Sequence, residues 1–239
     1  MSESPFLRIA IAGAGNVATQ LGLALKHAGF RIECVLNRSS EHGLILAERL
    51  DARFVTSFKA LDNPDLLIIA VSDDAISALA IHLIGCSFPV VHTSGTASKD
   101  VLSVIGPEYG VFYPLQTFSA DHYVDFSKVP ICIDSSNLIF TMRLESLAHS
   151  LSESVYQMAD QQRKILHLAG VFACNFSNYL YAVAAGILKN NDIPFDLLLP
   201  LIQETAVKIQ TTAPIDAQTG PAKRGDISTI QQHLQMLQS

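Results

Sequence analysis

The residue pattern with the clearest chemical meaning lies near the N-terminus, in the turn Gly13-Ala14-Gly15-Asn16-Val17-Ala18. Gly13 allows a tight turn after a strand, Gly15 lets the backbone approach a pyrophosphate, and Ala18 lets the next helix pack closely on the strand. The pyrophosphate then lies at a helix N-terminus, whose N–H groups and dipole favour negative charge. A strand before the turn and a helix after it supply the context that such a short motif needs. The pattern predicts a dinucleotide-binding turn; an ordinary glycine-rich strand–helix turn is the alternative.

The end of the second predicted strand bears on which dinucleotide binds. NAD-binding sites usually place an acid there for the ribose hydroxyls, whereas this sequence has Asn37-Arg38-Ser39. Arg38 can pair with a 2′-phosphate, which an acid would repel. We therefore expect NADP(H) rather than NAD(H), contacted by Asn37, Arg38 and Ser39. In the alternative, Arg38 is only a solvated loop cation.

Two later strands end in polar residues at the same expected edge of the sheet, where ligands of open α/β sheets bind. Val71 and Ser72 follow one of them and are predicted to touch the cofactor, while Asp73 is interpreted as a helix cap. Ser94 follows the other and is a candidate catalytic residue beside the nicotinamide. His92 lies inside an apolar run and is interpreted as a core histidine.

The helical part of the chain offers a second group of polar residues. Laid out at 100° per residue, His167, Cys174 and Asn178 share one side of a helix, and Asn175 borders them. This polar stripe either faces a pocket or is an exposed face. His167 alone has an unperturbed pKa suited to proton transfer near neutrality. The opposite side is an apolar stripe made of Ile165, Leu168, Phe172, Phe176 and Tyr179.

A further polar stretch, residues 219–226, contains Arg224, which could hold a carboxylate or phosphate of a substrate. Its glycines and proline shape a loop, and Asp226 could cap the last helix. A structural loop accounts for most of this stretch. We nevertheless retain Arg224 as a substrate contact, because the stretch is long for a connector.

Strand and helix patterns alternate up to about residue 158, and the pattern is helical from residue 160 onward. This alternation predicts an α/β fold: a Rossmann-like, doubly wound and mostly parallel sheet, followed by a smaller all-helical domain. The expected domains are 1–159 for dinucleotide binding and 160–239 for dimerisation and substrate binding.

Composition limits the classes of partner. The chain has 239 residues and a formal charge of −6, and its basic residues are scattered, which argues against nucleic acid or an anionic membrane as a partner. Its four cysteines form no CxxC pair and read as reduced core thiols, so no metal site or disulfide is expected. No signal peptide or uninterrupted apolar run of about 20 residues is apparent, so a cytoplasmic protein is expected. With 49% apolar residues, surplus apolar surface points to an oligomer.

Together these stretches resemble a poorly characterised family that joins a Rossmann-like NADP-binding domain to a C-terminal helical domain of unknown function. The resemblance covers nearly the whole chain and implies that the helical domain forms a homodimer and closes the pocket over the nicotinamide. The matching motifs are GAGNVA at 13–18, HTSG at 92–95, GVFYPLQTF at 110–118, HLAGVFACNFSNYL at 167–180 and TGPAKRGD at 219–226.

More distantly, the layout resembles ketopantoate reductase, pyrroline-5-carboxylate reductase, deazaflavin-dependent NADP reductases and the 6-phosphogluconate dehydrogenase group. That last group usually carries a lysine three or four residues before the asparagine that matches Asn175. This chain has Phe172 and Val171 there. Either another group such as His167 moves the proton, or the substrate is an already protonated imine, or no turnover occurs.

The leading hypothesis is an NADP(H)-dependent oxidoreductase that acts on a small polar substrate such as a ketoacid, an imine or a deazaflavin. A protein that binds NADP(H) as a sensor or scaffold, without chemistry, is the main alternative, and a binder of sugar nucleotides or nucleoside phosphates is a third. In the leading hypothesis the catalytic residues are His167, Asn175 and Ser94, and the substrate-binding residues are Gln116, Asn178 and Arg224.

Overall fold

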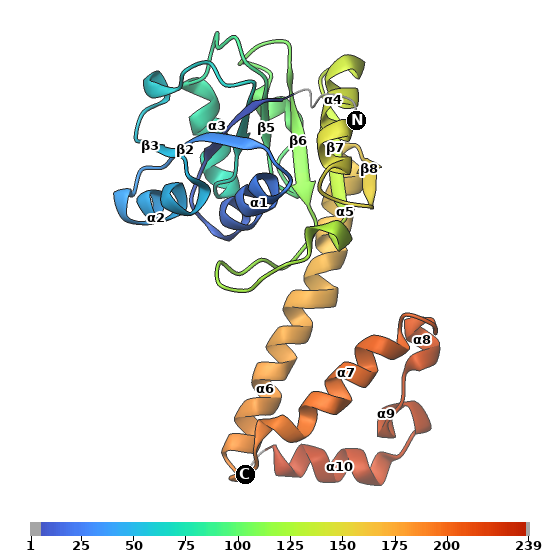
Figure 1. Ribbon diagram of the computed structural model, residues 1–239. Helices are drawn as coiled ribbons and strands as arrows, with labels where there is room; N and C mark the ends of the chain where they lie inside the picture. The colour runs from blue at the N-terminus through green and yellow to red at the C-terminus, as the bar shows by residue number, and fades with distance from the viewer. Residues whose placement is uncertain (1–5, 238–239) are drawn as a thin grey trace. The chain divides into compact units, whose positions relative to one another are not determined.

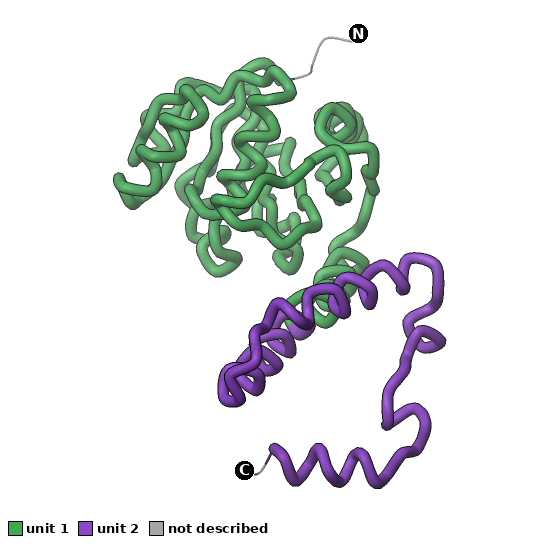
Figure 2. The backbone as a smooth tube through the Cα atoms, turned by 60° about the horizontal axis from the view of Figure 1, so that its bottom comes forward, with its two compact units in different colours: residues 1–175 green, residues 176–239 purple. Residues whose placement is uncertain are grey.

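The computed structural model describes residues 6–237, which form two compact units (Figure 2). The first comprises residues 1–175 and the second residues 176–239. The division lies further along the chain than the change of pattern at residue 160. Residues 160–175 belong to the first unit because Leu166 packs against Val111, Tyr113 and Cys132 of its sheet.

The first unit is built on one eight-stranded sheet (Figure 1). The strand order is β3-β2-β1-β4-β5-β6-β7-β8, and every neighbouring pair is parallel except β6 and β7. The order from β3 to β6 is that of a Rossmann fold, which confirms the predicted fold class. The strands are β1 (Arg8–Ala12), β2 (Arg31–Leu36), β3 (Arg53–Val55), β4 (Leu66–Ile69), β5 (Val90–His92), β6 (Tyr109–Pro114), β7 (Ile131–Ser135) and β8 (Val155–Gln157).

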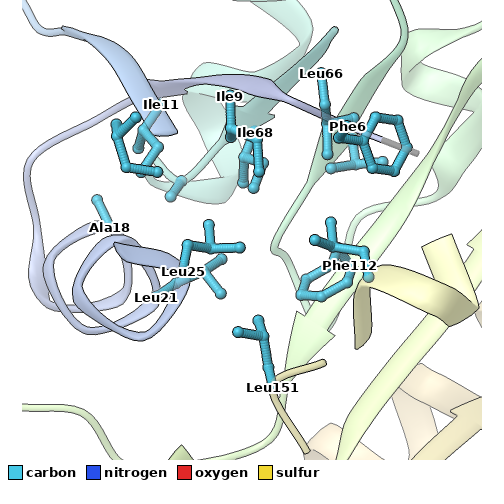
Figure 3. Close-up of a cluster of buried hydrophobic side chains, with 14 of the residues drawn as sticks. Phe6, Ile9, Ile11, Ala18, Leu21, Leu25, Leu66, Ile68, Phe112 and Leu151 are labelled. Atoms are coloured by element: carbon cyan, nitrogen blue, oxygen red, sulfur yellow. The ribbon is translucent and has the colours of Figure 1, made fainter. Parts of the chain in front are cut away.

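One face of the sheet is covered by α1 (Asn16–His27), α2 (Ser40–Leu50) and α4 (Leu138–His149). Leu21 and Leu25 of α1 face Ile9 and Ile68 of the sheet (Figure 3). Alternate residues of each strand point to this face because strand side chains repeat with a period of two. Burial of these large apolar side chains stabilises the layer and fixes α1 against β1.

The opposite face is covered by α3 (Asp73–Ile81), the 3₁₀ helix η2 (Lys99–Leu102) and α5 (Asp160–Gly170). The intervening strand residues, including Ala10 and Ile69, pack on this side. Two further 3₁₀ helices are η1 (Phe58–Ala60) and η3 (Phe126–Lys128). Helices therefore lie on both faces, as in a doubly wound sheet.

The segment after β8 is a helical run, Asp160–Lys189, interrupted by a π-helix. It consists of α5, the π-helix η4 (Val171–Phe176) and α6 (Ser177–Lys189). A π-helix bonds i to i+5, so it inserts a residue and changes the phase of the side chains. The uniform 100° layout from the sequence is therefore wrong beyond Gly170.

The same run is long and apolar enough, by length and composition, to cross a membrane. Its best window has a mean hydropathy of 1.4, and none of that window is buried. Ile165, Leu168 and Phe172 are among its exposed apolar residues. The run therefore presents an apolar face that is exposed in the single chain.

The second unit contains α6 followed by helices without a core of their own. These are η5 (Phe195–Leu198), α7 (Leu199–Lys208), α8 (Pro214–Ala217), α9 (Pro221–Arg224) and α10 (Ile227–Met236). No described residue from 176 onward is buried. Leu180 and Leu201, for example, are 64% and 63% exposed. The unit as it stands therefore lacks the apolar burial that stabilises a domain.

Candidate functional site

A cavity of about 710 Å³ lies at the edge of the sheet where β1, β2, β4, β5 and β6 end. Ligands of open α/β sheets bind in this position. The residues predicted from the sequence that line it are Gly13, Gly15, Asn16, Val17, Asn37, Arg38, Val71, Ser72, Ser94, Gln116 and His167. Segments far apart in the sequence thus meet around one cavity.

The first turn of α1 has the properties that a pyrophosphate requires. Gly13 has φ +120°, and a Cβ there would lie 2.1 Å from the carbonyl oxygen of Ala70, so the strand–helix turn requires glycine. Gly15 has open space where a Cβ would be and lines the cavity. The first turn carries no acidic residue and no side-chain cap, so its N–H groups can bind an anion. Ala18 is buried in the same core cluster as Ile9 and Ile11 of β1, as close packing of the helix on the strand requires, and it does not line the cavity.

The end of β2 supplies polar groups and no acid to the cavity. Arg38 is exposed and forms no ion pair with any residue that the structure describes. Asn37 donates from Nδ2 to the carbonyl oxygen of Ser39, which is the residue before α2 and does not line the cavity. His82 of the segment after α3 also lines it, stacked on Phe58 with ring centroids 5.9 Å apart. His82 could not be predicted as a cavity residue from the sequence, because no motif surrounds it.

The turn after β5 is held by hydrogen bonds from its own side chains. His92 is fully buried; its Nδ1 accepts from the Ser94 N–H at 3.1 Å, and its Nε2 lies 3.2 Å from the carbonyl oxygen of Ser98. The accepting Nδ1 leaves the ring proton on Nε2, which donates to Ser98. Burial lowers the pKa of His92 to about 4, although the bond to Ser98 opposes this shift. The interpretation of His92 as a core histidine is confirmed.

Ser94 in this turn is 6% exposed. Its Oγ accepts from the backbone N–H groups of Thr96, at 3.0 Å, and Ala97, at 2.9 Å. Its hydroxyl proton lies toward Thr96 Oγ1 or the cavity. Ser94 therefore shapes the turn and keeps one proton to donate. Asp73, interpreted as a cap, instead accepts from the Thr96 hydroxyl.

Helix α5 runs along this turn and fastens it. Asp160 accepts from Ser98 Oγ and from the Lys99 N–H at 3.2 Å. One turn later, Arg163 donates from Nη2 to Asp160 at 2.7 Å and to the carbonyl oxygen of Ala97. Arg163 is fully buried, and sequence analysis did not identify it. An arginine in a helical pattern normally reads as a solvated residue.

One more turn along α5, His167 reaches the cavity and meets β6. Its Nδ1 lies 3.1 Å from the hydroxyl oxygen of Tyr113, and the two rings meet edge to face. Burial raises the pKa of Tyr113 to about 12, so its hydroxyl is protonated at neutral pH. Gly95 lies directly against both rings. Tyr113 could not be recognised from the sequence as a site residue, because it lies in an apolar strand pattern like that of any core residue.

A second cavity of about 440 Å³ adjoins the first, and Tyr113, Gln116 and His167 line both. Its other lining residues include Asn175 and Cys174 of the π-helix. Cys174 is exposed, so the expectation of four core thiols is wrong for this residue. The π-helix brings Asn175 into the same cavity as His167.

The segment after β6 is held by α1. Asn16 donates from Nδ2 to the carbonyl oxygen of Phe118 at 2.9 Å. Gln20 is 6% exposed and donates to the carbonyl oxygens of Ser119, at 2.6 Å, and His122, at 2.9 Å. Asn16, predicted to contact the cofactor, therefore also ties this segment to the phosphate-binding turn.

The remaining predicted residues lie in the second unit: Asn178 on α6 and Arg224 at the end of α9. Among the residues described, no group of three His, Cys, Asp or Glu side chains could hold a metal ion.

The first unit contains His167, Asn175, Ser94 and Gln116 around two adjoining cavities. These features define a dinucleotide-binding protein of the Rossmann type.

Comparison with known proteins agrees with this class. Residues 7–92 match the model of an oxidoreductase family with an NAD-binding Rossmann fold, and residues 129–239 match a domain of unknown function, DUF2520. The chain is 41% identical to a protein from Bacteroides fragilis described as a "putative NADP oxidoreductase", over 98% of this chain and 92% of that one, with a TM-score of 0.93. The chain therefore belongs to the family that joins a Rossmann-type dinucleotide-binding domain to DUF2520.

More distant structures share the fold. A protein from Thermotoga maritima is 22% identical, with a TM-score of 0.79 over 94% of this chain and 88% of that one. A 1-pyrroline-5-carboxylate reductase from Streptococcus pyogenes is 17% identical, with a TM-score of 0.68 over 98% of this chain and 95% of that one. No curated protein matches the chain.

Proposed function

We propose that the protein is an oxidoreductase that uses NADP(H) and reduces or oxidises a small substrate in the second cavity. The observation that carries the proposal is the first cavity, whose lining includes Arg38, Gly15 at the start of α1, and His167. Gly13 and Gly15 would hold the pyrophosphate with the α1 N–H groups. Ser94 and Gly95 would flank the nicotinamide.

The preference for NADP(H) over NAD(H) rests on the end of β2. A 2′-phosphate needs a cation and hydrogen-bond donors, which Arg38 and Asn37 offer. Glu33, the acid of β2, lies within 4 Å of Arg8 and Arg53 rather than at the cavity. The relative from Bacteroides fragilis is likewise described as an NADP oxidoreductase.

When bound, NADPH would supply a hydride to a substrate carbon, and the heteroatom of a carbonyl or of a neutral imine would then have to gain one proton. Two titratable side chains, His167 and Tyr113, line both cavities. We assign the proton transfer to the substrate to His167, because an imidazole is the side chain best suited to general acid catalysis near neutral pH. Gln116 and Asn175 offer amide donors and acceptors that would orient a carbonyl or imine. Ser94 would donate its remaining hydroxyl proton. In the reverse direction the same groups would accept a proton.

The substrate class follows from the second cavity. It is lined by Leu115, Leu166 and Val171 together with uncharged polar groups such as Gln116 and Asn175. Such walls suit a compact carbonyl or imine compound with few polar contacts, whereas a ketoacid would also need a cation for its carboxylate and a deazaflavin is a larger ring. Arg224 and Asn178 of the helical unit are proposed as further substrate contacts.

One observation favours a second function, a non-catalytic NADP(H) sensor. The positions where related dehydrogenases carry a lysine are Val171 and Phe172, on the π-helix. A protein without a proton donor would bind the cofactor without turnover. The pair of His167 and Tyr113 is the reason to prefer catalysis.

We also propose a cytoplasmic homodimer in which a second copy covers the helical unit. The described part of this unit has no buried residue, and α6 has a single charged side chain, Lys189. An apolar surface of this kind marks an interaction site. A second copy brings the same surface and can bury both. This cover also accounts for the apolar run of α5 and α6 without a membrane.

The test is calorimetry on protein freed of carried-over ligand, titrated with NADPH, NADH and a sugar nucleotide. We expect tight binding of NADPH, weaker binding of NADH and none of the sugar nucleotide. Absence of heat with both pyridine nucleotides would exclude the oxidoreductase and the sensor together. NADPH consumption in a panel of ketoacids, imines and deazaflavins then separates the two, because only the enzyme responds.

A further inference from the structure

Three elements place Tyr113, His167 and Gly95 against one another. Tyr113 comes from β6, His167 from α5 and Gly95 from the turn after β5. A Cβ on Gly95 would lie 2.6 Å from His167 Nδ1 and 2.9 Å from Tyr113 Cζ. Any side chain at position 95 would displace at least one of the two rings. Glycine at this position therefore allows the rings of His167 and Tyr113 to lie in contact.

The hydrogen bond between the two rings has a definite direction. Tyr113 is 9% exposed, and its hydroxyl is protonated. The only acceptor that it reaches among the described residues is His167 Nδ1, at 3.1 Å. A buried hydroxyl that does not donate loses free energy, so Tyr113 donates and Nδ1 accepts. Neutral His167 then carries its own proton on Nε2.

Nε2 is the ring nitrogen left for a ligand. It forms no hydrogen bond to the described part of the chain, and His167 lines both cavities. In a neutral imidazole the hydrogen bond at one nitrogen decides which nitrogen carries the proton. The Tyr113 hydroxyl thus sets the protonation pattern of a side chain at the junction of the cofactor and substrate cavities.

We propose that Tyr113 is a positioning residue that holds His167 as the Nε2–H tautomer and supplies its proton through that ring. This inference rests on the proposed function of the site. As hydride reaches the substrate carbon, the Nε2–H bond breaks and the proton bonds to the substrate heteroatom. The Tyr113 O–H bond breaks at the same time, and its proton bonds to Nδ1. After product leaves, Nε2 takes a proton from water and Nδ1 returns one to the Tyr113 oxygen, for a net uptake of one proton.

The primary test measures the tautomer directly and needs no substrate. Nitrogen-15 NMR of the imidazoles, with His167→Gln to assign the signals, should show mainly the Nε2–H form of neutral His167. Tyr113→Phe keeps the ring and removes the hydroxyl, so His167 should shift toward the mixture of an unconstrained imidazole. Tyr109→Phe is the matched control, because this hydroxyl on the same strand lies 3.5 Å from Asp100. Identical His167 spectra in wild type and Tyr113→Phe would overturn the proposal.

A second variant tests the same contact independently, in case Tyr113→Phe disturbs the fold. Gly95→Ala forces the His167 ring aside and should change the same signals, while the spectra of exposed histidines away from this turn, such as His149, stay as they are. Unchanged His167 signals in Gly95→Ala would contradict the contact on which the inference rests.

Kinetics with an accepted substrate add an independent readout. Tyr113→Phe should lower kcat by about 10²-fold with unchanged NADPH affinity, because proton transfer is affected and binding is not. Combining it with His167→Gln should cost no more than His167→Gln alone. Additive losses would show that Tyr113 does not act through His167. If no substrate is turned over, the oxidoreductase proposal fails while the NMR result still decides the tautomer.

Discussion

Asp160 and Arg163, one turn apart on α5, form an ion pair of 2.7 Å in which the guanidinium group is completely buried. Nε and Nη1 of Arg163 have no hydrogen-bond partner among the described residues. Its positive charge is therefore compensated by Asp160, together with the carbonyl oxygen of Ala97. This pair joins α5 to the turn that carries Ser94.

Removing the charge of Asp160 should destabilise the fold. Asp160→Asn leaves a buried guanidinium without a counterion, which costs about 3–5 kcal/mol in comparable cases. Urea unfolding should show a loss of about 3 kcal/mol, since Asp160 keeps some contact with water. Asp121→Asn, at an exposed residue, should change little. Equal stability of the two variants would mean that Arg163 is satisfied in another way.

The buried His92 predicts a pH dependence of stability. Burial lowers its pKa to about 4 from an ordinary value of 6.5, so between these values the unfolded chain binds more protons than the fold. Stability is then complete above pH 6.5 and falls as the pH drops toward 4, by up to about 3 kcal/mol. His92→Gln, followed by chemical unfolding across this range, should flatten the slope. His149→Gln, at an exposed ring, should leave the slope as in wild type.

The two glycines of the phosphate-binding turn should separate folding from binding. Gly13→Ala places a Cβ against the Ala70 carbonyl at a positive φ, so the melting temperature should fall by an amount equivalent to about 2 kcal/mol or more. Gly15→Ala meets no protein atom within 4 Å. It should melt like wild type and bind NADPH at least about tenfold more weakly, as measured by calorimetry. If Gly15→Ala binds NADPH with normal affinity, the proposal that the pyrophosphate lies against this turn is wrong.

Charge reversal at Arg38 should change the cofactor preference. Arg38→Asp loses a charged hydrogen bond to the 2′-phosphate and adds repulsion, so NADPH affinity should fall by about 10- to 100-fold. NADH affinity should stay constant or rise. Arg31→Asp changes the net charge equally at the other end of β2 and controls for long-range effects. Parallel losses for NADPH and NADH in Arg38→Asp would contradict a 2′-phosphate site.

A charge in the apolar face of α6 should disrupt self-association. Leu180 is 64% exposed in a single chain and would be buried in the proposed homodimer. Burying an unpaired carboxylate is unfavourable, so Leu180→Glu should raise the dimer dissociation constant by at least about 100-fold in sedimentation equilibrium. Lys189→Glu at the end of α6 is the matched control. A wild-type chain that sediments as a monomer would refute the homodimer outright.

Much of the dinucleotide-binding part was readable in the sequence because it depends on local rules. The second predicted strand, which ends just before Asn37, coincides with β2, and Gly13 shows the positive φ that a tight turn requires. Arg38 and Ser94 were found because both follow buried strands, whose ends share one edge of the sheet. Pattern and topology together were enough for these residues.

The rest depends on long-range contacts that no local pattern encodes. The antiparallel pairing of β6 and β7 and the short strand Val155–Gln157 have no distinct signature. Tyr113 and Arg163 read as an ordinary core residue and an ordinary surface residue, and only their partners on other elements distinguish them. The π-helix Val171–Phe176 also breaks the regular period on which helix predictions rely.

The single antiparallel pairing decides which way the later chain travels. Because β7 and β8 run antiparallel to β6, the chain leaves the sheet on the side opposite the cavity. Helix α5 therefore has to run back toward the cavity. Successive turns of the helix contact the turn after β5: Asp160 contacts residue 98, Arg163 contacts residue 97, and His167 contacts residue 95. If all eight strands were parallel, the helix after β8 would begin at the cavity side of the sheet and run away from the cavity. The cavity is therefore lined both by a turn near the N-terminus and by a helix from much later in the chain. Reversing the direction of β7 and β8 would leave Gly13 and Gly15 in place but would take His167 away from the cavity.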